Sequence, residues 1–106
     1  MAFREKDYLK KQIDQAARAI ARALGFKDAG NIDEARAELD RGAKSVLGIG
    51  MLPLSRVDPA SAVGLLRSRA KAEAYAELLE AQATIEDSEP LRERARAIRH
   101  VVSAAD

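Results

Sequence analysis

The sequence predicts a single all-α domain of four or five helices over residues 1–106. Apolar residues recur at intervals of three and four along most of the chain, as they do on one face of a helix. No stretch alternates apolar and polar residues with a period of two, as a half-buried strand would. The pattern is interrupted over residues 48–57, where Gly and Pro gather. This connecting loop divides a predicted hairpin at 5–47 from C-terminal helices at 58–105.

The predicted hairpin contains two helices, at about residues 5–25 and 32–47, and each carries one apolar stripe. Between them "FKDAGN" turns the chain, and Gly30 is free to adopt the positive φ that closes a helix. Asn31 is predicted to cap the second helix, with Glu34 three residues further on. Because the turn is short, the two helices should lie antiparallel, capped by a second helical layer from the rest of the chain.

The C-terminal part is predicted to contain the remaining helices. Asp58 followed by Pro is a typical helix start, and it opens a short helix. A strongly helical pattern then covers about residues 69–87, with a wide apolar arc that indicates more than one neighbour. The pattern does not decide whether these two stretches are one helix or two, and a break near Ser68 is favoured. Ser88 is predicted to cap the last helix.

The core is expected to be thin. Hydrophobic residues make up 47% of the chain, but 22 of them are Ala. Alanine has the best helix propensity and lets helices approach closely, yet it buries little apolar area. A lone copy of such a chain should be marginally stable, so we expect added burial through self-association, as a homodimer or larger homo-oligomer.

Composition argues against several classes of function. The sequence has no Cys, so it forms no disulfide and no Cys-based zinc site, and its one His, His100, has no evident catalytic partners. No apolar run approaches the ~18 residues of a membrane span, and the charged first residues do not resemble a secretory signal. We therefore expect a cytoplasmic, non-enzymatic protein with no catalytic residue, cofactor, metal, small-molecule substrate or membrane partner.

Residues 16–47 resemble one unit of the tetratricopeptide repeat, a pair of antiparallel helices with small and large residues at set spacings. The matching residues are Ala23, Phe26, Gly30, Ile32, Ala35, Leu39 and Gly42. The sequence departs from the repeat at Ala19, Arg22 and Leu47, where Trp, Leu and Pro are usual. No tandem copy follows 34 residues later. The resemblance implies a single tetratricopeptide-like hairpin that the C-terminal helices must cap.

A second resemblance covers nearly the whole chain. "FREKDYLKKQI", the "GNIDEA" turn and "AYAELLEAQATI" are similar to a family of small, uncharacterised bacterial proteins. Those proteins are predicted to be all-helical and tetratricopeptide-like, and no activity is known for them. The resemblance therefore implies a fold and a bacterial origin, and it implies no site.

We expect the chain to act as a protein–protein interaction module or small adaptor. Its predicted partner-binding surface combines two groups of apolar residues. The first group is on or next to the first helix and consists of Tyr8, Leu9, Ile13 and Phe26. The second group is in the connecting loop and consists of Met51, Leu52 and Leu54. The loop residues have two interpretations, because they could form an exposed contact patch or fold back over the hairpin end and cover the core.

The alternative function is binding of nucleic acid through a basic C-terminal helix. Arg92, Arg96 and Arg99 fall on one helical face, which could contact phosphates if it adjoins the basic residues of the first helix. No aromatic residues interleave these arginines, and the net charge is only +1. Nucleic acid is therefore the less favoured partner.

Overall fold

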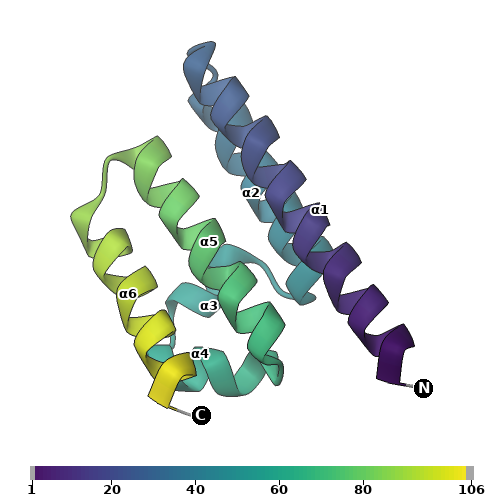
Figure 1. Ribbon diagram of the computed structural model, residues 1–106. Helices are drawn as coiled ribbons and strands as arrows, with labels where there is room; N and C mark the ends of the chain where they lie inside the picture. Colours follow the sequence, from purple (N-terminus) through teal and green to yellow (C-terminus); the bar gives the residue numbers. More distant parts are fainter. Residues whose placement is uncertain (1, 105–106) are drawn as a thin grey trace.

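The first two helices form an antiparallel hairpin (Figure 1). The computed structural model describes residues 2–104, and side chains from residue 10 onward; α1 spans Ala2–Asp28 and α2 spans Ile32–Leu47. Gly30 takes a φ of +85° in the turn, as predicted. Helix α1 ends three residues later than expected, because Phe26 packs partly against the core and remains helical. Asn31 occupies the N-cap position, but its side chain makes no capping hydrogen bond to a described residue.

Small residues line the contact between α1 and α2. Every one of them is buried, and α2 also buries larger side chains, Leu39, Val46 and Leu47 among them. The small residues of this contact are Ala16, Ala19, Ala23, Ala35, Gly42 and Ala43. This alanine-lined contact lets the two helices pack closely while burying little area per residue.

The segment predicted as a connecting loop contains a short helix, α3, at Met51–Ser55. Gly48, with a φ of +78°, ends α2. The Asp40 carboxylate on α2 then accepts a hydrogen bond of 3.1 Å from the Met51 N–H, which ties the start of α3 to the hairpin. Pro53 lies in the first turn of α3, where a missing N–H costs nothing. The loop expectation for 48–57 is therefore corrected to a turn and one helical segment.

Three more helices complete the fold: α4 (Pro59–Leu66), α5 (Arg69–Glu86) and α6 (Glu89–Ala104). The break between α4 and α5 confirms that residues 58–87 are not one helix. The Asp58 carboxylate accepts the Ser61 N–H at 3.1 Å, and the Ser68 hydroxyl accepts the Lys71 N–H at 3.3 Å. The Ser88 hydroxyl accepts the Leu91 N–H at 3.4 Å, so Asp58 and Ser88 cap their helices as predicted. Ser68, predicted only as the place of a break, caps α5 as well.

Helix α5 lies at the centre of the molecule. It forms a second antiparallel hairpin with α6 and also packs against α1, α2 and α4 (Figure 1). Tyr75, Leu78 and Leu79 of α5 are fully buried, where they meet Leu54 and Ile98. Each such side chain contributes roughly 1.5–3 kcal/mol by burial. The prediction of an all-α fold is confirmed, with six helices and no strand in residues 2–104.

Arg94 of α6 connects three parts of the fold. Its Nε donates to the Tyr75 hydroxyl at 3.1 Å, and its Nη2 donates to the carbonyls of Leu54 at 2.6 Å and Val57 at 2.8 Å. The guanidinium carbon lies 5.9 Å from the centroid of the Tyr75 ring. Arg94 therefore connects the end of α3, and Val57 just after it, to the α5–α6 hairpin.

Candidate interaction surface

An apolar stripe on α1 lies beside the face that α1 buries. It consists of Ile13, Ala17, Ile20 and Leu24, which recur at intervals of four, three and four residues and so share one side of the helix. Ile20 and Leu24 are half-buried against the core, whereas Ala17 is exposed and Ile13 is 38% exposed. Part of this stripe is therefore open to a partner.

Helix α5 provides the opposite wall of a groove beside this stripe. We call it the α1–α5 groove, an open hollow of about 380 Å³. Its lining residues are Ala17, Ile20, Leu24, Glu77, Glu80, Ala81 and Thr84. Glu80 accepts a 2.8 Å hydrogen bond from Arg99, while Glu77 has no ion-pair partner among the described side chains. The groove thus combines an apolar floor with an acidic edge.

The predicted partner-binding residues of the first helix do not form one patch. Ile13 belongs to the exposed stripe. Phe26 lies at the other end of α1 and packs partly against the core. The side chains of Tyr8 and Leu9 lie outside the described residues. Ile13 is thus the member of this group that adjoins the α1–α5 groove.

The three apolar residues predicted in the connecting loop separate into two environments. Met51 is 8% exposed and Leu54 is fully buried, so both belong to the core. Leu52, on the outer side of α3, is 64% exposed. The expectation of an exposed patch is corrected for Met51 and Leu54, because the period of a helix turns both inward. The segment folds back over the hairpin end, which was the other interpretation of its apolar residues.

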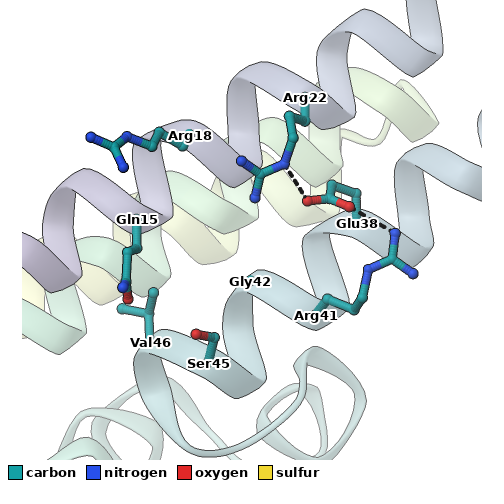
Figure 2. Close-up of a pocket in the computed structure, with 8 residues that line it drawn as sticks. All are labelled: Gln15, Arg18, Arg22, Glu38, Arg41, Gly42, Ser45 and Val46. Atoms are coloured by element: carbon teal, nitrogen blue, oxygen red, sulfur yellow. Dashed lines mark hydrogen bonds and ion pairs between the residues drawn. The ribbon is translucent and has the colours of Figure 1, made fainter.

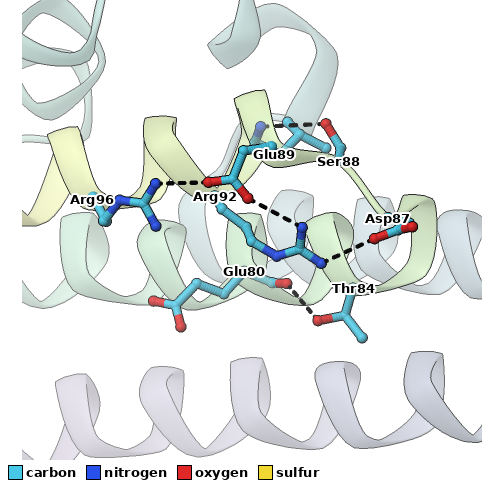
Figure 3. Close-up of polar contacts among 8 residues, drawn as sticks. Glu80, Thr84, Asp87, Ser88, Glu89, Arg92 and Arg96 are labelled. Carbon is cyan, nitrogen blue, oxygen red and sulfur yellow. Dashed lines mark hydrogen bonds and ion pairs between the residues drawn. The ribbon is translucent and has the colours of Figure 1, made fainter.

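The arginines of the nucleic-acid alternative are occupied by carboxylates (Figure 3). Arg92 lies 3.4 Å from both Asp87 and Glu89, and Arg96 lies 2.9 Å from Glu89. Hydrogen bonds from Arg96 and then Arg92 hold the pKa of Glu89 below its ordinary value.

The third arginine of this face, Arg99, pairs with Glu80. Helix α5 lies between α6 and α1, so the basic residues of the two outer helices do not adjoin (Figure 1). The described part of the chain therefore offers no continuous basic surface across α1 and α6 to a nucleic acid.

The structure contains a charged cluster between α1 and α2 that the sequence did not predict (Figure 2). Glu38 is 8% exposed and accepts hydrogen bonds from Arg22 at 2.6 Å and Arg41 at 2.7 Å, one on each carboxylate oxygen. Hydrogen bonds from Arg41 and Arg22 hold the pKa of Glu38 below its ordinary value. The sequence does contain one indication that Glu38 is buried. Glu38 lies three residues after Ala35 and four before Gly42, so it shares a helix face with these two buried residues.

Other kinds of site find little support in the structure. His100 is exposed on α6. Within the described residues, no group of three or more His, Asp or Glu side chains could hold a metal ion. No described helix is long and apolar enough to cross a membrane. Comparison of the chain with protein-family models, with curated proteins and with solved structures returned no match.

Proposed function

We propose that this protein is a non-enzymatic protein–protein interaction module that self-associates through the α1–α5 groove. The observation that carries the proposal is the partly exposed apolar stripe on α1. Ala17, Ile20 and Leu24 line the groove, and Ile13, 38% exposed, continues the stripe one turn beyond it. Aligned apolar side chains at these intervals are suited to hold the apolar face of another helix. The occupant that we propose is α1 of a second copy of the chain.

The length of α1 supports a second copy as the occupant. Helix α1 has 27 residues and α2 has 16. The Gln12 side chain already contacts the Val46 carbonyl near the end of α2, at 3.4 Å. The first turns of α1 therefore run past α2 by about 15 Å (Figure 1). This end of α1 therefore extends beyond the hairpin, where a neighbouring copy can reach it.

Charge complementarity points to the same occupant. Lys10 and Lys11 lie on α1 where it leaves the hairpin, and both are exposed. The acidic edge of the groove is formed by Glu77 and by Glu80, and Glu80 already pairs with Arg99, so among the described side chains Glu77 supplies the uncompensated charge. In an antiparallel pair of α1 helices, the lysines of each copy can approach the acidic edge of the other. Such exposed pairs orient a complex more than they strengthen it.

Three further properties accompany the proposal. The thin, alanine-rich core gains apolar burial when two copies associate. The packing of α5 against both α1 and α2 is compatible with the tetratricopeptide-like character that we infer for the first hairpin. A cytoplasmic location agrees with the lack of Cys, since small secreted domains often depend on disulfides.

Sedimentation equilibrium of the full chain over a range of concentrations tests this function. We expect the wild type to dimerise, and Ala17→Glu to remain monomeric because its carboxylate enters the apolar floor of the groove beside Glu77. Ala60→Glu is the matched control, since Ala60 is exposed on α4, which packs on α5 and α6. A wild type that stays monomeric at high micromolar concentration, or equal dimerisation by both variants, contradicts the proposal. Circular dichroism verifies that both variants keep their helicity.

A further inference from the structure

A second hollow lies between α1 and α2, away from the α1–α5 groove. Its volume is about 400 Å³, and we call it the hairpin hollow. Its polar lining consists of Gln15, Arg18, Arg22, Glu38, Arg41 and Ser45 (Figure 2). The volume falls in the range of about 300–1,000 Å³ that is typical of small-molecule sites.

Close packing of the two helices builds this hollow. A Cβ atom on Gly42 would lie 2.6 Å from the Cβ of Ala19, so α2 approaches α1 as closely as a glycine permits. At this separation Arg22 of α1 reaches the buried Glu38 of α2. The contact between Arg22 and Glu38 therefore depends on the close spacing of the α1 and α2 backbones.

Glu38 holds two guanidinium groups at the hollow. Arg22 uses its Nε–H and Arg41 an Nη2–H on the carboxylate. Each guanidinium has five N–H donors, so most of the donors of both groups remain available. The side chains of Arg22 and Arg41 are 56% and 61% exposed, so these remaining donors are accessible to a ligand. Two arginines oriented in advance lose less conformational entropy when an anion binds.

Arg18 adds an uncompensated charge. Among the described side chains it has no hydrogen-bond or ion-pair partner, and it lines the same hollow one turn from Arg22. Three guanidinium groups and one carboxylate leave an excess of two positive charges. The Ser45 hydroxyl and the Gln15 amide supply neutral donors beside them. A phosphoryl group with about −1.5 to −2 charge and several acceptor oxygens complements this set.

We propose that the hairpin hollow is a binding site for a phosphate monoester. Arg22 and Arg41, which flank Glu38, contact the phosphoryl oxygens, and Arg18, whose guanidinium points away from Glu38 in Figure 2, turns toward the ligand when it binds. The hollow is wider than the phosphoryl group, so part of the esterified group also enters it. The monoester belongs either to a phosphorylated small molecule or to a phosphoserine side chain. Its site lies on α1 and α2 alone and does not rest on the proposed self-association.

Titration of the isotope-labelled full chain, followed by amide NMR shifts, tests the site. The probes are inorganic phosphate, ribose 5-phosphate and a phosphoserine peptide with its unphosphorylated form. We expect all three phosphorylated probes to shift amides of residues 18–22 and 38–45, and the unphosphorylated peptide to leave them in place. Whichever ester binds more tightly identifies the source of the monoester.

Two charge-matched variants make the test specific. Arg18→Gln should weaken binding of the tighter ester at least tenfold, because it removes a charge without breaking a described contact. Arg56→Gln is the control, since Arg56 is exposed at the end of α3 and carries the same charge. Ala17→Glu should bind the ester as the wild type does, which separates this site from the groove. Absence of any phosphate-dependent shift, or equal loss in both Arg variants, overturns the proposal.

Discussion

Gly42 determines how closely the two helices of the first hairpin approach each other. Gly42 of α2 faces Ala19 of α1, which is 1% exposed. No space remains between these two residues for a methyl group on Gly42. In most helices a glycine is a cost of roughly 1 kcal/mol relative to alanine. At this position the cost is offset by the contact that the missing side chain permits.

Gly42→Ala should lower the free energy of unfolding by up to about 2 kcal/mol, because overpacking of about 1–3 kcal/mol outweighs a gain of roughly 1 kcal/mol in helix propensity. Gly25→Ala is the matched control in α1, since a Cβ there has nothing within 4 Å. That variant should be more stable than the wild type by about 0.5–1 kcal/mol. Urea denaturation at one protein concentration compares them. If Gly42→Ala is as stable as Gly25→Ala, then Gly42 does not determine the spacing of the two helices.

Among the helices, α3 depends most on contacts from elsewhere in the chain. It has five residues, too few for independent stability, and its polar ends are satisfied by side chains of α2 and α6. Asp40 accepts the first N–H of α3, from Met51. Arg94 donates to the carbonyl of Leu54, in the last turn of α3, and to that of Val57, two residues after the helix ends. These contacts explain why α3 is helical although it contains a proline and follows two glycines.

Arg94→Gln should therefore destabilise the protein by about 1–3 kcal/mol, since it removes the side-chain donor to the carbonyls of Leu54 and Val57. Tyr75→Phe should cost about 1 kcal/mol, because it removes the acceptor of the Arg94 Nε–H without changing the buried ring. The two losses should not add in the double variant, which chemical denaturation measures as a coupling energy. Arg92→Gln, on the same helix, should change stability by less than about 0.5 kcal/mol. Additive losses at Arg94 and Tyr75 would contradict the shared network.

The elements that could be predicted are those whose own residues specify them. The long helices follow from apolar stripes, and the starts of α4, α5 and α6 follow from capping side chains. Helix α3 could not be predicted, because its partners lie 11 and 40 residues away. Nor does any local pattern show that Arg94 turns inward while Arg92 and Arg96 pair on the surface. The groove likewise depends on how α5 is placed against α1.

For the whole molecule, the response to acid depends on four carboxylates whose pKa values the fold lowers. Lys44 lowers the pKa of Asp40, and Ser61 lowers that of Asp58, as the arginines do for Glu38 and Glu89. Because these groups bind protons more weakly when folded, the unfolded chain takes up more protons in acid. Their contribution to stability is complete above the unfolded-state pKa values and is lost as pH falls through the lower folded-state values.

The free energy of unfolding should therefore be nearly constant from neutral pH to about 5 and fall below the ordinary Glu38 value of 4.5. Glu38→Gln should be less stable than the wild type by about 1 kcal/mol at neutral pH, since both of its partners are more than half exposed. The gap should close in acid, where the wild type protonates Glu38. Urea midpoints measured across this range show the effect. A gap that is independent of pH would mean that Glu38 is not ionised in the fold.

The central position of α5 bears on how the chain folds as it is synthesised. The alanine-lined helices emerge from the ribosome first, but the leucines and the tyrosine that cover them are in α5, at Arg69–Glu86. A nascent chain that ends before this helix can form only a weak, uncovered hairpin. Stable structure should then appear late in translation, so that the first half of the protein remains accessible to chaperones while the second is made.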